Sequence, residues 1–206
     1  MRMIMRLSVI LTLAAGAAFG QDDDVFRPMK GSATPSFLMT TGNGRCLVFG
    51  THIVKTTQTE DGGENVSIWH REGTAKGAAA CNVQAEPYAT IKDSDNNSFY
   101  GISAVYFFID MGTSVGSRSL AVYKTGSGDE VTTVNYNSSG GEPRIEAARY
   151  LYYDASSDKK GRTASCPEAA KWKRQGGGVD WVQAKKMDLD AGTITNIGVL
   201  RCVYME

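Results

Sequence analysis

The sequence predicts a mostly β protein: an antiparallel β-sandwich or barrel with one short α-helix near residues 165–175 and two disulfides. Three observations predict this class. Runs rich in Val, Ile, Thr and Tyr recur along the chain, clusters of Gly, Asn, Asp and Ser separate them, and four cysteines follow an export signal. Many short strands joined by turn clusters are typical of antiparallel sandwiches and barrels.

The candidate strands are the β-rich runs between these turn clusters. The run from Ala104 to Ile109 is apolar, which predicts a central strand covered on both faces. The segment 144–153 contains the helix-compatible residues EAAR, but the tyrosines near its end favour a strand. The complete set of candidate strands is 45–55, 65–71, 82–92, 99–110, 118–125, 130–136, 144–153, 179–186 and 194–205.

One helix is predicted between the candidate strands 144–153 and 179–186. Ser165 and Glu168 form a capping-box pattern, in which each side chain bonds the backbone N–H of the other residue. Pro167 suits a first helical turn, because its missing N–H would have no partner there. The glycines at 176–178 end the helix, and basic residues precede them, where a cation is favourable.

Residues 1–20 are predicted to be a cleaved signal peptide. Arg2 and Arg6 precede an apolar run over residues 7–19, and small residues end the segment. The run is too short to span a bilayer and no later segment is long enough, so no membrane insertion is expected after the signal is removed. We therefore expect a periplasmic or secreted protein.

The rest of the chain suits a single domain. Residues 21–35 are polar with two prolines and are predicted to be a flexible leader, while residues 36–206 form a single β-rich domain. Without Arg2 and Arg6, 20 basic residues stand against 22 acidic ones. A chain so close to neutrality gives no reason to expect nucleic acid as a partner.

The four cysteines are expected to form disulfides, because an exported protein meets an oxidising compartment. Three pairings are possible, and pairing of neighbours in sequence is favoured: Cys46 with Cys81 and Cys166 with Cys202. Each loop of that size contributes roughly 4 kcal/mol by the chain-entropy argument. No two cysteines have CxxC spacing, which disfavours a zinc site or a redox pair.

The best match to a catalytic motif is the GxSxG pattern around Ser114. The pattern should open a helix, but a strand-like segment follows, and both histidines precede the serine. His52, Asp110 and Ser114 reproduce the chain order of a chymotrypsin-like triad without any local signature. A glycine-rich hairpin turn is therefore the favoured interpretation, and His52 is expected to face the packed side of its strand, with a His52-centred site as the alternative.

One segment has the spacing of a calcium loop. Asp93, Asp95 and Asn97 place oxygen atoms at alternate positions, but Ser98 replaces the loop glycine and Ala104 stands where a bidentate Glu is needed. Asp and Asn side chains also bond their own backbone in tight turns. Turn chemistry is thus the simpler explanation, and no cofactor or metal is expected.

Tyr150 and Tyr152 share one face of a predicted strand, and Leu151 and Tyr153 share the other. One face must be core, so the other presents tyrosines that offer a platform for a sugar or protein.

The favoured function is a non-catalytic envelope or periplasmic domain that binds a protein or glycan partner through a sheet face or its hairpin loops. One alternative is an envelope hydrolase that uses Ser114 or a His52-centred site. Another is an inhibitor or immunity-type protein that inserts a rigid loop, for which residues 125–130 and 137–143 are the candidates.

Overall fold

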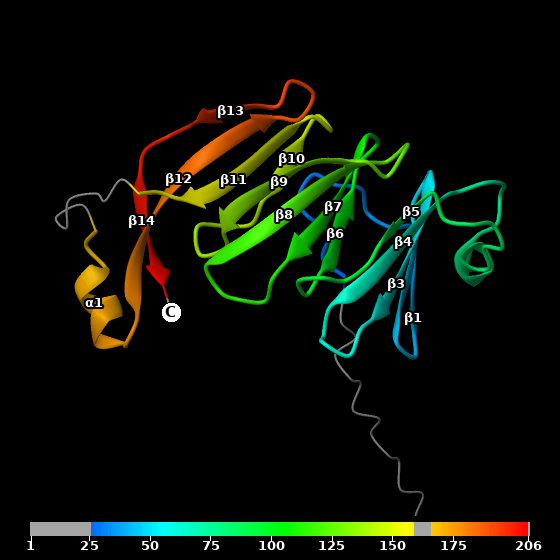
Figure 1. The fold of residues 1–206 in the computed structure, drawn as a ribbon, viewed down its shortest axis with the longest axis horizontal. Helices are drawn as coiled ribbons and strands as arrows, with labels where there is room; N and C mark the ends of the chain where they lie inside the picture. The colour runs from blue at the N-terminus through cyan, green and yellow to red at the C-terminus, as the bar shows by residue number, and fades with distance from the viewer. Residues whose placement is uncertain (1–25, 159–165, 206) are drawn as a thin grey trace, which may run out of the picture.

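A computed structural model describes residues 26–158 and 166–205 of the chain (Figure 1). These residues form three antiparallel sheets, one 3-10 helix, one short α-helix and two disulfides. The predicted mostly β, antiparallel class is confirmed, as are the pairings Cys46–Cys81 and Cys166–Cys202. Within the described ranges no helix has the length and apolar character needed to cross a membrane.

The first sheet is a meander in which each strand pairs with the next. Its strands alternate between buried and exposed positions, as in β4, where Val66 and Ile68 are fully buried while Ser67 is only partly covered. The strands are β1 (Phe37–Thr41), β2 (Gly44–Val48), β3 (His52–Gln58), β4 (Glu64–His70) and β5 (Ala89–Ile91).

The second and third sheets follow in the same order along the chain. The middle sheet is a four-stranded meander, and in the third sheet β14 pairs with β12 beside a β10-β11-β12-β13 path. The middle strands are β6 (Ser98–Ile102), β7 (Tyr106–Met111), β8 (Ser117–Lys124) and β9 (Glu130–Asn137). The third sheet contains β10 (Arg144–Glu146), β11 (Tyr150–Ser156), β12 (Gly178–Asp188), β13 (Thr193–Asn196) and β14 (Arg201–Met205).

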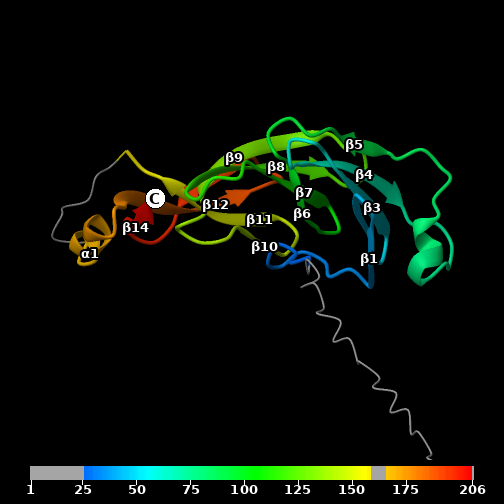
Figure 2. The same ribbon diagram turned by 90° about the horizontal axis from the view of Figure 1, so that it is seen from below.

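The middle sheet is covered on both faces. In β7, Tyr106 and Phe108 point into a core shared with the third sheet, while Phe107 and Ile109 point into a core shared with the first sheet. The view in Figure 2 shows strands of the third sheet passing beneath β8 and β9. The apolar run predicted over 104–109 to be a doubly covered strand is therefore confirmed over residues 106–109, where every side chain is buried, whereas Ala104 and Val105 are exposed in the turn before β7.

Several predicted strands are divided in two by turns that carry no strong turn signal. Residues 45–55 form β2 and β3 around a turn at 49–51, and 99–110 form β6 and β7 around a turn at 103–105. In the second turn the Ser103 hydroxyl accepts hydrogen bonds from the backbone N–H groups of Val105 and Tyr106. Each turn is only three residues long and holds a single turn-forming residue, Gly50 or Ser103, among neighbours that suit a strand, which is why the residue pattern did not reveal them.

Three later predicted strands are also divided or shortened. Residues 144–153 divide into β10 and β11, because Ala147 and Ala148 adopt positive φ angles of 51° and 50° between them. Residues 194–205 divide into β13 and β14, and only 89–91 of the predicted strand 82–92 is extended. A pair of alanines at positive φ is sterically unfavourable, so no sequence rule would place this turn.

Residues 26–35 belong to the folded body, which differs from the flexible leader predicted over 21–35. Met29 is 2 % exposed and lies in the core between the middle and third sheets, and Phe26 stacks on Phe99 at 5.6 Å. The Met29 N–H donates to Tyr100 O at 2.8 Å, and the Ile145 N–H donates to Lys30 O at 3.0 Å. The segment thus bonds to edge strands of two sheets.

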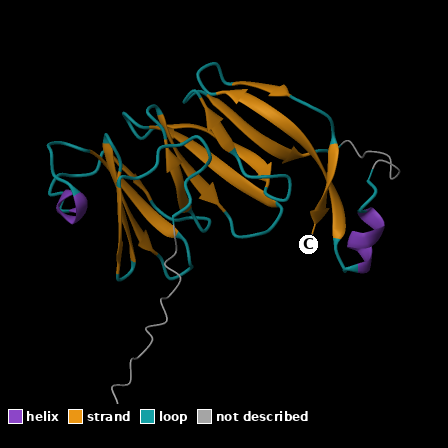
Figure 3. Cartoon of the chain, turned by 180° about the vertical axis from the view of Figure 1, so that it is seen from behind, coloured by secondary structure: helices purple, strands orange, loops and turns teal. Residues whose placement is uncertain are grey.

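The two helical segments lie at opposite ends of the molecule, each beside a disulfide (Figure 3). The 3-10 helix η1 (Gly77–Cys81) is joined to β2, and the helix α1 (Ala169–Arg174) lies near the bridge from Cys166 to β14. The predicted helix near 165–175 is confirmed but shorter. Its cap is Glu168, which makes no side-chain capping bond, and Ser165 lies outside the described residues.

Candidate ligand-binding groove

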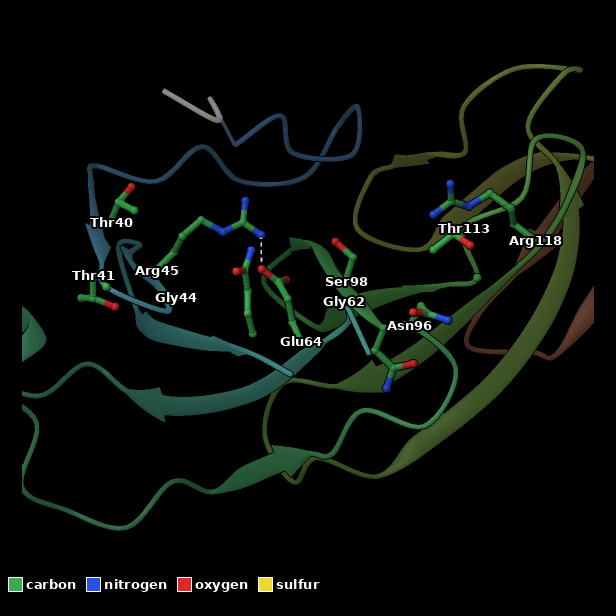
Figure 4. A pocket seen from close by; sticks show the side chains of 14 residues that line it. Thr40, Thr41, Gly44, Arg45, Gly62, Glu64, Asn96, Ser98, Thr113 and Arg118 are labelled. Carbon is green, nitrogen blue, oxygen red and sulfur yellow. Dashed lines mark hydrogen bonds and ion pairs between the residues drawn. The ribbon is translucent and has the colours of Figure 1, made fainter. Parts of the chain in front are cut away.

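A groove of about 650 Å³ brings together turns of the first and middle sheets (Figure 4). The turn between β1 and β2, the turn between β3 and β4, the segment before β6 and the turn after β7 each contribute to it. The lining residues are polar side chains or glycines: Thr40, Thr41, Gly42, Gly44, Arg45, Gln58, Gly62, Glu64, Asn96, Asn97, Ser98, Gly112, Thr113 and Arg118.

Glycines are required where the groove approaches the backbone. A Cβ at Gly44 would lie 1.9 Å from the carbonyl oxygen of Thr56, so no other residue fits β2 at this position. Gly112 has a φ of 94°, a conformation that side-chain-bearing residues rarely adopt. The turns that shape the groove therefore depend on residues that carry no side chain.

Arg45 points toward the centre of the groove, where it pairs with Glu64 (Figure 4). Glu64 also accepts a hydrogen bond from the Thr56 hydroxyl at 3.1 Å and from the backbone N–H of Phe99 at 3.0 Å. The carboxylate consequently ties the first sheet to β6, and the arginine is held in one orientation by a buried partner.

Arg118 stands on the other side of the groove, beside Thr113 (Figure 4). Its guanidinium bonds both oxygens of Asp110, at 3.2 and 2.5 Å, and the Tyr136 hydroxyl donates to the same carboxylate at 2.9 Å. Burial raises the pKa of the Asp110 carboxyl, and the Arg118 charge opposes that rise. Asp110, which does not itself line the groove, thus holds the Arg118 guanidinium in place.

The lining offers many uncommitted polar groups, and both of its guanidinium groups are paired with carboxylates. Each guanidinium is matched by one carboxylate, Glu64 for Arg45 and Asp110 for Arg118. Six further polar side chains of the lining form no hydrogen bond to another described residue: Thr40, Thr41, Gln58, Asn96, Ser98 and Thr113. Such a groove suits a ligand that both donates and accepts hydrogen bonds and carries no charge.

No hydrogen bond joins His52, Asp110 and Ser114, the three residues whose chain order resembles that of a catalytic triad. The Ser114 hydroxyl donates to the carbonyl oxygen of Ser117 at 2.9 Å, within the turn between β7 and β8. Asp110 is bonded by Arg118 and Tyr136, and no hydrogen bond joins either residue to His52. The GxSxG segment is a hairpin turn, as its glycines favoured.

His52 is 6 % exposed and belongs to a cluster of aromatic rings at the far end of β3. Its Nδ1 lies 2.8 Å from the Thr51 hydroxyl, and its ring lies 5.4 Å from that of His70, which stacks on Tyr88 at 4.4 Å. Burial and the nearby His70 lower the pKa of His52, while a backbone hydrogen bond at Thr125 raises it. The cluster packs together without an acid partner for either ring.

The candidate calcium residues form a turn. Asp93 Oδ2 accepts from the Thr59 hydroxyl at 2.7 Å and Oδ1 accepts from the Asn97 N–H at 2.7 Å. The Thr59 bond holds the pKa of the Asp93 carboxyl below its ordinary value. The Asp95 carbonyl accepts from the Gly112 N–H at 2.8 Å, which joins this turn to the groove. Among residues 26–158 and 166–205, no cluster of three or more His, Cys, Asp or Glu side chains is arranged to hold a metal.

Tyr150 and Tyr152 share the outer face of β11 as predicted, while Leu151 and Tyr153 are buried. Cations cover the tyrosine rings: the Lys186 Nζ lies 3.8 Å from the Tyr150 ring centroid, and the Arg144 guanidinium lies 4.3 Å from that of Tyr152. A ring face under a cation is not open to stack on a sugar. The tyrosines stabilise the surface of the third sheet.

The two loops considered for an inhibitor are held against the body. A Cβ at Gly128 would lie 2.7 Å from that of Ala89, so the 125–130 loop packs closely on β5. In the 137–143 loop, Arg201 donates to the carbonyl oxygen of Gly140, and the Asn137 amide donates to Asp180 at 2.7 Å.

Sequence reasoning missed the groove residues Arg45, Gln58, Thr113 and Arg118. They come from two parts of the chain, the strands β2 and β3 and the turn between β7 and β8 with the start of β8. Only Thr113 lies in a motif considered above, the GxSxG pattern, which drew attention to Ser114 instead. Turn clusters were visible in the sequence, but their convergence depends on how the first and middle sheets pack.

No protein-family model matches the chain, and no curated protein or solved structure is significantly similar to it.

Proposed function

We propose that this protein is an exported, non-catalytic domain that binds a neutral, hydroxyl-rich glycan segment in the groove between its first and middle sheets. The observation that carries the proposal is the lining, in which six unbonded polar side chains surround two guanidinium groups already neutralised by carboxylates. A volume of about 650 Å³ is within the usual range of ligand sites.

A glycan fits this lining better than a protein partner does. Protein interfaces depend on apolar and aromatic anchors at their centre. No aliphatic or aromatic residue lines the groove. Sugar hydroxyls donate and accept at the same atom, which matches a mixture of amides, hydroxyls and guanidinium groups.

The groove chemistry supports binding over glycoside hydrolysis. Glycosidases use two carboxyl groups, roughly 5–10 Å apart, as acid and as base or nucleophile. Glu64 is the only acidic residue of the lining, and it is bonded to Arg45, Thr56 and the Phe99 N–H. A carboxylate held in this way is committed to joining the sheets.

Export is supported by the sequence of residues 1–20 and by two disulfides, which persist in oxidising compartments. A periplasmic or secreted location places the groove where envelope or extracellular glycans occur.

The proposal is tested with an array of neutral and acidic oligosaccharides, followed by calorimetry with the best neutral probe. Gln58→Ala and Thr113→Ala, both at exposed sites in the groove, should each weaken binding about tenfold, as expected for one lost hydrogen bond to a ligand. Thr193→Ala, on the exposed strand β13, is the matched control and should leave affinity unchanged. Failure of every neutral probe, preference for acidic probes, or insensitivity to both groove variants would refute the proposal.

A further inference from the structure

The middle and third sheets pack on each other, and their edge strands come together at two places, which we call seams: β6 with β10, and β9 with β13. At the first seam an extended segment of the chain lies between the two edge strands. Residues 29–33 lie between the edge strands β6 and β10. The Met29 and Ala33 N–H groups donate to Tyr100 O and Ile102 O, at 2.8 and 2.7 Å. Lys30 forms a parallel bridge with Arg144, and the Met29 side chain enters the core between the sheets.

The opposite edge of the middle sheet has no such cover. β9 pairs with β8 on one side, and no described residue bonds to the backbone of 131–136 on the other. β13 is likewise an edge strand, and all four of its residues are exposed. A groove of about 450 Å³ runs between β9 and strands β11 to β13.

This second groove reaches the same core that Met29 fills at the first seam. Val134, Tyr153 and Ala155 line it, and each is less than 8 % exposed and belongs to that core. Ile194, 51 % exposed, lies at its outer side. A strand placed here would therefore direct alternate side chains onto an apolar floor.

The groove also carries one positive charge. Lys185 is the only charged residue of its lining, and its ammonium group makes no ion pair with a described residue. Lys185 is the register partner of Tyr153, so both side chains lie on the groove face of the third sheet. An acidic side chain next to the apolar positions of an incoming strand would pair with it.

We propose that β9 accepts an extended segment of another polypeptide by strand addition. The segment places apolar residues against Val134 and Ala155 and an acidic residue against Lys185. Main-chain hydrogen bonds to the free edge of β9 supply affinity, and the alternate side chains supply specificity. Residues 29–33 show that the same pair of sheets already accommodates such a segment at the other seam.

The test selects binders from a displayed library of random seven-residue peptides on the folded, oxidised protein. Enriched peptides should alternate apolar and polar residues with an acid two or four positions from an apolar one. A selected peptide should protect amides of 131–136 from hydrogen exchange. Substituting Pro at a position whose N–H faces β9 should abolish binding, because the ladder loses a donor.

The charge requirement is tested with Lys185→Glu, which should weaken the selected peptide about tenfold, as expected for a lost charge-assisted contact. The same peptide with its acid changed to Lys should bind the variant better than it binds the original protein. Lys173→Glu on the exposed face of α1 is the matched control and should have no effect.

Other results overturn the proposal. These are a library without enrichment, peptides indifferent to the proline and charge changes, or protection of 193–196 in place of 131–136. Amides of β9 already protected in the free protein would indicate that another part of the chain or a second copy occupies the edge. Sedimentation at several concentrations distinguishes those two occupants. Because glycan probes and peptides address different grooves, failure here leaves the proposed function untouched.

Discussion

Each end of the molecule has one disulfide, but the residues that surround the two disulfides differ. The bridges Cys46–Cys81 and Cys166–Cys202 close loops with sequence separations of 35 and 36. At the first end Cys46 and Cys81 lie in an apolar cluster with Val48, Ile53 and Ala80. At the second end Ala169 is the only buried residue of α1, and the cysteines belong to none of the three core clusters.

Loop-closure entropy depends on loop length, so it is nearly equal for the two bridges. Any difference in what they contribute must come from packing. We infer that the first bridge reinforces a cluster that unfolds with the body, whereas the second holds together an end that packing alone supports weakly. Spacing in the sequence therefore predicts which cysteines pair but not what each pair stabilises.

The largest expected effect is the loss of the first bridge. Cys46→Ala with Cys81→Ala should lower the free energy of global unfolding by about 4 kcal/mol, because the unfolded chain gains loop freedom and the apolar cluster loses two buried sulfurs. Urea denaturation of the two proteins measures it. An unchanged midpoint would mean that this end opens independently of the body.

The packing around that bridge is tested without touching the cysteines. Ile53→Ala should cost about 3 kcal/mol, because Ile53 is 5 % exposed and a cavity would remain in the cluster. Trp172→Ala at the other end should cost about 1 kcal/mol, since its aromatic contact is an edge-on approach to Tyr204 at 6.1 Å. If thermal unfolding showed the same loss of stability for both variants, the inferred difference in packing between the two ends would be wrong.

Loss of the second bridge should have a local result. Cys166→Ala with Cys202→Ala should lower global stability by no more than about 1 kcal/mol while α1 and β14 lose protection from hydrogen exchange. Amides of β7 and β8, buried in the middle sheet, serve as the internal reference. A global loss as large as that of the first bridge would contradict the local interpretation.

The smallest effect is a pH dependence confined to the first end. Burial lowers the pKa of His52 in the folded state, so the unfolded chain binds a proton first as the pH falls below about 6.5. Stability contributed by neutral His52 is complete above that pH and is progressively lost below it. His52→Asn should flatten this part of the stability profile. A slope that persists in the variant would assign it to another group.

The sequence predicted the fold class, the disulfide pairing and the doubly buried strand, because each depends on local composition or spacing. The YFFI run of 106–109 has no polar residue to face water, which leaves a central position as the solution. The turn at 147–149 was not predictable, because two alanines at positive φ form it, and the turn at 49–51 was missed because its one turn residue, Gly50, stands alone within a β-rich run.

The candidate sites were harder to predict for a physical reason. Asp110 was considered as a triad acid, yet its actual partner, Arg118, is eight positions away across the turn between β7 and β8. Tyr150 and Tyr152 were placed on the correct face, but the cations that cover them come from neighbouring strands or from the turn before β11. Sequence pattern assigns a side chain to a face, while its neighbours are decided by strand register.

Residues 29–33 are synthesised before any strand of the three sheets, yet their partners come from β6 and from β10, far along the chain. Contacts between such distant segments form late, because the intervening chain must first be brought together. A nascent chain that stops short of Arg144 therefore lacks the third-sheet residues of the core around Met29. Completion of the body waits for the C-terminal half, and truncated products should expose apolar surface and aggregate.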